Sequence, residues 1–164
     1  MSKKPQPSPM PGHINSHGSC LWICGHPVAQ PRPRAAAVNG KARVYQPSGA
    51  AKQYKKHIAL RARQVFAEPL SGPVSLNLWF CMPRPKNRTW INKPMPREWH
   101  TSRPDVDNLM KAVMDALNGV AWQDDSQVCE TLAAKCVAAG SDSVGVWIAV
   151  TPVGGFCPPG IPGV

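Results

Sequence analysis

Carboxylate side chains gather in one short segment of this chain. The sequence has 9 Asp and Glu residues against 19 Lys and Arg, and its net charge is +10. Six of the nine acidic residues lie between Asp105 and Glu130. Crowded carboxylates repel one another and are costly to bury, whereas a divalent cation with a preference for oxygen ligands removes that cost. The segment therefore predicts a metal site in a basic protein, which is typical of an enzyme that cuts nucleic acid.

Asp105 and Asp107 are the first candidates for metal ligands. Pro104 favours an extended backbone before Asp105, and alternate residues of an extended segment share a face. Both carboxylates can therefore point toward one ion. A helix is expected to follow, and its first amide groups and positive dipole end would point toward the same place. Lys111 comes one helical turn after Asp107, on the same side of that helix.

A third carboxylate, Asp124 or Asp125, follows the expected helix and a turn. A strand–helix–strand path could return it to the first pair. Two or three carboxylates with open water positions fit Mg²⁺ or Mn²⁺. In phosphodiester hydrolysis the metal would activate a water, neutralise a phosphate oxygen and stabilise the leaving 3′ oxygen. Lys111 would stabilise the charge on phosphorus or position the water.

Purely structural roles are also open for these residues. Asp107 or Asn108 can cap the helix, Asp124 and Asp125 can form a turn, and Lys111 can pair with Asp115 four residues on. Each role alone is more common than catalysis. The joint occurrence of these carboxylates and Lys111 in so basic a chain nevertheless favours a metal-dependent nuclease.

The periodicity of the apolar residues predicts a small mixed sheet flanked by helices, of the α/β (α+β) class. Asn39-Gly40 marks a tight hairpin turn between two short strands. The segment 127–137 is expected to be a strand, with a short helix as the alternative. Residues 1–20 and 151–164 are rich in Pro and Gly and are expected to be disordered around a folded domain at 21–150. The expected helices are 49–66 and 108–118, and the expected strands are 21–24, 35–38, 42–45, 74–81, 127–137 and 144–150.

Two of the expected strands lead into stiff basic arms. The first leads toward Pro31-Arg32-Pro33-Arg34, and the second into Pro83-Arg84-Pro85-Lys86. Prolines keep such arms extended, so Arg32, Arg34, Arg84 and Lys86 are predicted to contact DNA phosphates. In the loop after the second arm, Trp90 and Trp99 alternate with basic residues, and they could either stack on bases or pack on the core.

The six cysteines show no regular disulfide framework. Cys20-x3-Cys24-x-His26 lacks a second pair with zinc-finger spacing, so reduced and mostly structural cysteines are expected. Cys24 and Cys81 lie in apolar runs, where a free thiol behaves as a small hydrophobe. No apolar run is long enough for a signal peptide or a membrane span, and a cytoplasmic protein is expected.

Residues 103–128 form a long and specific block, RPDVDNLMKAVMDALNGVAWQDDSQV. This block resembles the RusA family of Holliday junction resolvases, which is common in bacteria and their prophages. Weaker similarity extends to 25–34 and 69–86, so the resemblance covers roughly 21–150.

The resemblance implies a homodimer that binds four-way DNA junctions in recombination and repair. It also implies paired symmetric nicks made with Mg²⁺ or Mn²⁺ and no contact with membranes. The family's catalytic and metal-binding aspartates match Asp105, Asp107 and Asp125, with Asp124 still open as the third, and its functional lysine matches Lys111. Arg103 opens the matching block and is expected to contact DNA.

Two other functions remain open. The chain could be a structure-selective DNA-binding protein of the same fold with a weak or inactive metal site. The intact carboxylates favour the nuclease, because a pure binder would gain from losing groups that repel phosphate. A metal-dependent nuclease acting on flaps or on RNA is disfavoured only by the family resemblance.

Overall fold

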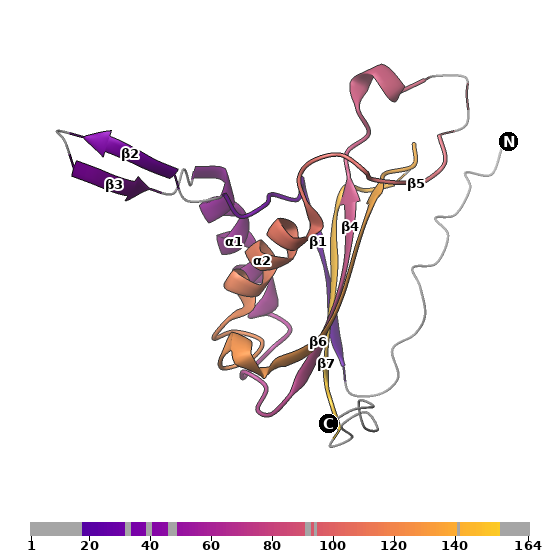
Figure 1. The fold of residues 1–164 in the computed structure, drawn as a ribbon. Coiled ribbons are helices and arrows are strands. Elements are labelled where there is room, and N and C mark those ends of the chain that lie inside the picture. The colour runs from indigo at the N-terminus through magenta and orange to yellow at the C-terminus, as the bar shows by residue number, and fades with distance from the viewer. Residues whose placement is uncertain are drawn as a thin grey trace, which may run out of the picture.

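The computed structural model describes residues 18–31, 34–38, 41–45, 49–90, 93, 95–140 and 142–154. It consists of a mixed five-stranded sheet with two helices on one face, and a separate two-stranded hairpin (Figure 1). The predicted α+β class is confirmed. Most of the two predicted disordered ends, and also Arg32, lie outside the described residues.

The large sheet has the strand order β1-β7-β4-β6-β5. Its central strands are β4 (Val74–Met82) and β7 (Gly145–Pro152), and β1 (Ser19–Cys24) forms one edge. β6 (Val128–Val137) pairs parallel to β4, and the chain between them crosses over through a helix. β5 (Glu98–Trp99) pairs antiparallel with only the last two residues of β6.

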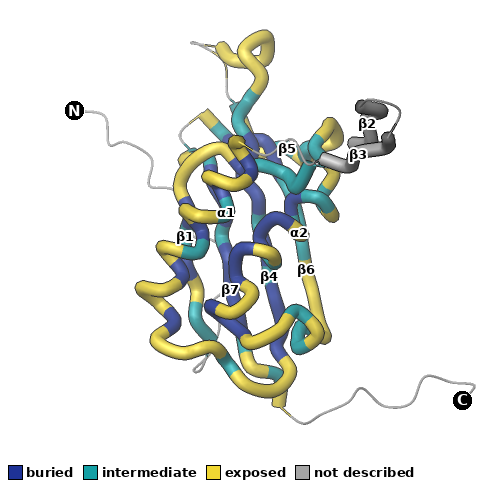
Figure 2. Tube along the Cα trace, turned by 90° about the vertical axis from the view of Figure 1, so that its left-hand side faces the viewer, coloured by how far each residue is buried: buried dark blue, intermediate teal, exposed yellow. Residues whose placement is uncertain are grey.

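Both helices pack on the same face of this sheet. They are α1 (Gly49–Ala62) and α2 (Val106–Leu117). The predicted apolar stripe of α2, Leu109, Val113 and Leu117, is fully buried. It packs in one core with alternate residues of β4, because alternate side chains of a strand point to the same face. In Figure 2 the buried, dark blue stretches of the trace lie on α2 and on the central strands β4 and β7.

The hairpin consists of β2 (Arg34–Val38) and β3 (Lys41–Tyr45), paired antiparallel. Its two strands confirm the prediction made from Asn39-Gly40. The hairpin extends away from the large sheet, ahead of α1 (Figure 1).

The element boundaries differ from the predictions in several places. α1 ends at Ala62 rather than 66, and α2 begins at Val106, two residues earlier than expected. β6 is a strand, so the helical alternative for this segment was wrong. Two short 3-10 helices, η1 (Lys86–Arg88) and η2 (Asp125–Gln127), and the short strand β5 were not predicted.

The sheet face opposite the helices carries a row of tryptophans. Trp22, Trp147 and Trp79 are direct partners across β1, β7 and β4, and the ring of Trp99 lies 5.9 Å from that of Trp79. Trp99 therefore packs on the protein, although it remains 69% exposed.

The five cysteines in the described part of the chain are free. Cys81 and Cys136 are buried, whereas Cys24 is exposed, so the prediction that Cys24 packs as a small hydrophobe was wrong. Among the described residues, no helix is long and apolar enough to cross a membrane.

Candidate active site

Asp105 lies immediately before α2, and its carboxylate is not used as a cap. Its backbone is extended (φ −70°, ψ 148°), as Pro104 predicted, and its side chain makes no capping hydrogen bond. Asp107 lies in the first turn and is exposed, and within the described part of the chain it has only a long contact of 3.5 Å from Asn108 Nδ2 to its Oδ1. The structural alternative, a capping role for Asp107 or Asn108, was wrong. Both carboxylates are free to bind a ligand.

A cleft of about 480 Å³ opens beside Asp105. A hydrogen bond of 2.9 Å from the backbone amide of Gln30 to the backbone carbonyl of Asn108 links two of the residues that line it. The side-chain Oε1 of Gln30 is buried and has no hydrogen-bond partner among the described residues. The lining of the cleft thus contains both the free carboxylate of Asp105 and the unpaired side-chain oxygen of Gln30. Its lining residues are Ala29, Gln30, Arg103, Pro104, Asp105 and Asn108.

Lys135 of β6 fixes the backbone that leads into Asp105. Its Nζ donates to the carbonyl of Ser102 at 2.7 Å and to that of Pro104 at 2.6 Å. No signal in the sequence pointed to this role, because Lys135 stands thirty residues after Asp105 in an ordinary strand. Gln30 was also missed, and its only signal was its place within the weak similarity at 25–34.

Lys111 lies on the exposed face of α2, one turn after Asp107. The alternative pairing of Lys111 with Asp115 was wrong, because Asp115 instead pairs with Lys55 of α1 at 3.3 Å. In the described structure, no ion pair involves Lys111. Its ammonium is available to a bound phosphate.

Asp124 and Asp125 lie at η2, beyond the far end of α2. Asp124 caps η2: its carboxylate accepts from Ser126 N at 2.9 Å, and Gln127 completes a capping box. Ser126, through its side chain and then through its backbone amide, lowers the pKa of Asp124 below its ordinary value. Asp125 accepts a hydrogen bond of 2.8 Å from Nε1 of the buried Trp122 on Oδ1. The carboxylate of Asp124 is therefore engaged in capping η2. Asp125 uses only Oδ1 in its bond to Trp122, so its second carboxylate oxygen remains available among the described residues.

The predicted return of a third carboxylate does not take place within one chain. The 12 residues of α2 separate Asp105 from η2, which corresponds to about 18 Å at the usual rise of a helix. Figure 1 shows η2 and the start of α2 at opposite ends of this helix. The described residues of a single chain contain no group of three His, Cys, Asp or Glu that could hold a metal.

Comparison with known proteins identifies the family. The family model described as Endodeoxyribonuclease RusA matches residues 25–151. The chain belongs to this family. It is 38% identical over 119 residues to the uncharacterized protein YqaN of Bacillus subtilis strain 168, covering 69% of this chain and 83% of the relative. It is 29% identical over 104 residues to the crossover junction endodeoxyribonuclease rusA of Lactococcus phage r1t, covering 62% of this chain and 74% of the relative.

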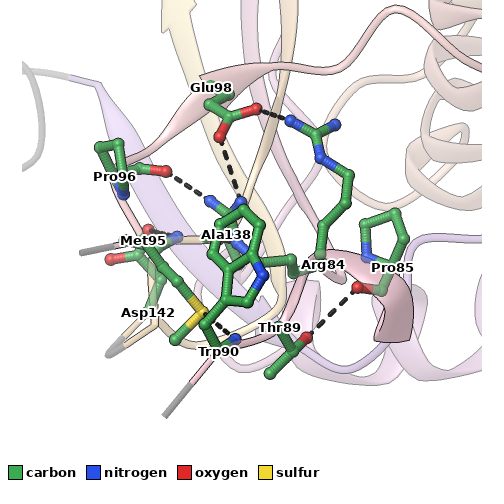
Figure 3. Close-up of polar contacts among 11 residues, drawn as sticks. Arg84, Pro85, Thr89, Trp90, Met95, Pro96, Glu98, Ala138 and Asp142 are labelled. Atoms are coloured by element: carbon green, nitrogen blue, oxygen red, sulfur yellow. Dashed lines mark hydrogen bonds and ion pairs between the residues drawn. The ribbon is translucent and has the colours of Figure 1, made fainter. Parts of the chain in front are cut away.

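The basic residues of this RusA-family chain divide into buried and exposed groups. Arg84 was predicted to contact DNA, but its side chain is only 6% exposed. Its guanidinium donates to Glu98 at 3.2 Å, to the carbonyl of Ala138 at 3.1 Å and to that of Pro96 (Figure 3). Arg88 also contacts Glu98. Arg84 thus links the end of β4 to the loop before β5 and to Ala138. Because its guanidinium is used in these contacts, we do not retain it as a DNA contact.

Arg103 and Lys86 are exposed, so both remain available to DNA. Arg103 lies at the cleft itself, and Lys86 lies in η1. Arg34 begins β2, and its side chain is outside the described structure. Trp90, whose role in the loop was left open, is 40% exposed.

His100 is a titratable group beside Lys135. Its backbone amide donates to the Lys135 carbonyl at 3.2 Å. Burial, and then the positive charge of Lys135, lower the pKa of His100 below its ordinary value. The imidazole is therefore neutral at physiological pH. Of these two groups, Lys135 alone carries the positive charge beside the Asp105 segment.

Proposed function

We propose that this RusA-family endodeoxyribonuclease is a Mg²⁺-dependent homodimer that binds four-way DNA junctions and resolves them by paired symmetric nicks. The observation that carries the proposal is the pair of free carboxylates, Asp105 and Asp107, beside a cleft at the start of α2. The family membership and the printed name of the Lactococcus phage relative support the choice of substrate.

The residues around the cleft fit a divalent cation. Asp105 and Asp107 offer free carboxylate oxygens, and the buried Oε1 of Gln30 has no partner among the described residues. Mg²⁺ and Mn²⁺ prefer such oxygen ligands together with water. When bound, the ion would supply a Lewis acid and a counter-charge for the scissile phosphate.

The remaining roles fall to the chain's own groups. The free amides at the start of α2 favour a phosphate near Asp105. Lys111 donates to a non-bridging phosphate oxygen, where negative charge builds as water attacks phosphorus. The bond from phosphorus to the 3′ oxygen breaks, and that oxygen takes up a proton. Arg103 binds the backbone next to the cleft, and Lys135 keeps the Asp105 segment in place.

A cleavage assay tests the proposal directly. Purified protein is incubated with an end-labelled four-way junction or a linear duplex of the same sequence, with Mg²⁺ or with chelator. We expect paired cuts in two strands of like polarity, only in the junction and only with the metal. The matched control is the double variant Asp105→Asn and Asp107→Asn, which should bind the junction without cutting it. Equal cutting of the duplex would reject junction resolution.

A junction-binding protein without nuclease activity is the second candidate. The separation of Asp125 from Asp105 within one chain favours it, because a site with two carboxylates holds a metal less firmly than one with three. Tight junction binding without cuts in either Mg²⁺ or Mn²⁺ would establish this function instead.

A further inference from the structure

Two buried thiols lie side by side near the end of the central strands. Cys81 of β4 and Cys136 of β6 are direct partners in the parallel pairing of these strands, and both thiols are free. Neighbouring strands of a sheet lie about 4.8 Å apart, within the roughly 4.4–6.8 Å that separates the Cα atoms of disulfide-bonded cysteines. The backbone thus holds the two residues at a separation that suits a disulfide.

The surroundings of the pair favour negative charge on the sulfur of Cys136. The hydrogen bond that Cys81 donates is the main cause that lowers the pKa of the Cys136 thiol to about 7, in spite of its burial. Nε1 of Trp79 and the positive charge of Arg97 act in the same direction. The same hydrogen bond, together with burial, raises the pKa of Cys81. The two thiols are therefore chemically unequal.

The indole of Trp79 gives independent support for a charged sulfur. Its Nε1 is buried and makes no hydrogen bond of ordinary geometry in the described structure, and a buried donor without a partner is costly. Trp79 packs against the small buried cluster that contains both thiols. A thiolate at Cys136 would supply the acceptor that this indole lacks.

A thiolate beside a second thiol is the arrangement of a redox-active pair. The thiolate is the reactive form of cysteine, whereas buried cysteines that only fill space are inert. Cysteines that respond to peroxide combine a low pKa with a neighbouring thiol that resolves the oxidised product. Cys136 has the features of the first residue, and Cys81 lies in the place of the second.

We propose that Cys81 and Cys136 form a redox-active dithiol, which hydrogen peroxide converts into an intrachain disulfide. The sulfur of Cys136 attacks one peroxide oxygen, the O–O bond breaks, and the other oxygen takes up a proton and leaves as water. The sulfur of Cys81 then attacks the resulting sulfenic acid. As the S–S bond forms, the S–O bond breaks, and its oxygen leaves as water with the thiol proton of Cys81. The dithiol loses two electrons and two protons, and the peroxide is reduced to two waters.

The short strand β5 controls access to the pair. Cys136 is 2% exposed and pairs with Trp99 of β5, whose indole is 69% exposed and lies 5.9 Å from that of Trp79. β5 consists of only two residues, and elements with few contacts open locally at a low free energy. Opening of β5 exposes Cys136 to a small neutral oxidant while the rest of the sheet stays paired.

The disulfide acts on the candidate active site through Lys135, and this consequence rests on the proposed function. Lys135 directly precedes Cys136 and donates to the carbonyls of Ser102 and Pro104. An S–S bond of about 2.05 Å draws Cys136 toward β4 and displaces the neighbouring Lys135. Loss of a group that orients a metal ligand costs about 10- to 100-fold in activity. We therefore expect the oxidised protein to cleave more slowly than the reduced protein.

Peptide mapping tests the disulfide. A variant that keeps only Cys81 and Cys136, with Ser at the other four positions, is treated with peroxide and then alkylated. Mass spectrometry should show the loss of two hydrogen atoms and one cross-linked pair of peptides, and dithiothreitol should restore both thiols. The matched control keeps only Cys20 and Cys24, which are exposed and four residues apart on β1. No disulfide in the first variant, or an equal yield in the control, would overturn the proposal.

Trapping with dimedone tests the separate roles of the two thiols. In the same background, Cys81→Ser should accumulate a sulfenic acid on Cys136 that dimedone labels, whereas Cys136→Ser should give little label on Cys81. The alanine variants at both positions should behave alike, which separates the chemistry from the effect of a buried hydroxyl. Equal labelling of the two single variants would contradict the assignment of Cys136 as the attacking residue.

Single-turnover cleavage of a four-way junction tests the link to the active site. Peroxide should slow the variant that keeps only Cys81 and Cys136 by about 10-fold, and dithiothreitol should restore the rate. The same variant with Ser at both positions is the control, and its rate should not respond to peroxide. An unchanged rate in fully disulfide-bonded protein would reject the link through Lys135. If the reduced protein never cuts DNA, the proposed function fails, while the peptide map still decides the redox pair.

Discussion

The ammonium of Lys135 lies 2.6 Å from the carbonyl oxygen of Pro104, the residue directly before Asp105. A strand of the central sheet thereby fixes the orientation of a carboxylate that lies outside the sheet. Groups that orient a ligand side chain commonly change metal affinity or activity 10- to 100-fold when they are removed. Lys135 is therefore a positioning residue for the candidate metal site.

Lys135→Met should slow single-turnover cleavage of a four-way junction by about 10- to 100-fold. Junction affinity should stay close to that of the wild type, because the ammonium faces backbone carbonyls of its own chain. Lys135→Arg, which keeps the donors, should recover part of the rate. An equal loss of binding and cleavage would instead make Lys135 a DNA contact.

Asp107→Asn should abolish cleavage and leave junction binding unchanged or tighter, since it removes a negative charge that repels phosphate. Gel-shift and cleavage assays on the same labelled junction measure both effects. Asp115→Asn is the matched control, because this carboxylate lies on the same helix but pairs with Lys55. Retained cleavage by Asp107→Asn would remove Asp107 from the metal site.

Lys111→Ala should reduce the cleavage rate by about 100-fold, as loss of a donor to the developing charge does in other enzymes. Binding should weaken only slightly. Lys52→Ala on the exposed side of α1 provides a lysine control that should cut normally. If Lys111→Ala instead lowered junction affinity without changing the cleavage rate constant, Lys111 would bind phosphate without taking part in catalysis.

Arg84 and Lys86 should respond in opposite ways. Arg84→Gln breaks a part-buried ion pair with Glu98 and should lower the free energy of unfolding, without changing the salt dependence of DNA binding. Lys86→Gln should leave stability unchanged and reduce the slope of log affinity against log salt by about 1. Urea titrations and binding at several salt concentrations distinguish the two, and a changed slope for Arg84→Gln would contradict its assignment.

Asp142 should make the fold sensitive to acid. The Arg97 guanidinium, 2.9 Å away, holds the pKa of this carboxyl below its ordinary value. The unfolded chain therefore takes up the proton at a higher pH than the folded chain. This stabilisation is complete above the ordinary pKa of about 4 and is lost as the pH falls through the lower, folded value.

Asp142→Asn should thus lower the free energy of unfolding at pH 7 by about 2 kcal/mol and flatten its decline below pH 4. Urea unfolding at pH 7, 5 and 3 measures this effect. Asp115→Asn, which removes a more exposed carboxylate, should change stability by less than about 1 kcal/mol. An unchanged decline in acid would show that other carboxylates dominate it.

The main elements of the fold could be predicted from the sequence because their signals are local. The four-residue spacing of Leu109, Val113 and Leu117 predicted α2, and the alternation in β4 predicted its buried face. β5 could not be predicted in this way, since two residues carry no periodicity. Its position depends on pairing with Val137, almost forty residues away.

The candidate site was predictable only in part for the same reason. Asp105 and Asp107 were expected on one face of an extended segment, but α2 already begins at Val106, so Asp107 is helical and the alternation of an extended strand does not apply to the pair. Whether Asp125 joins them depends on where a whole helix ends, and the structure puts Asp125 at the other end of α2. Arg84 was misassigned because a sequence does not reveal that Glu98 lies opposite it.

The tryptophan row on the open sheet face has a spectroscopic consequence. Trp22, Trp147, Trp79 and Trp99 lie close together there, whereas the Asp105 cleft contains no tryptophan among its lining residues. Four of the six tryptophans stand on this face, so the indole spectra of the native protein report largely on it. The protein thus contains an intrinsic probe that reports on its helix-free side without any added label.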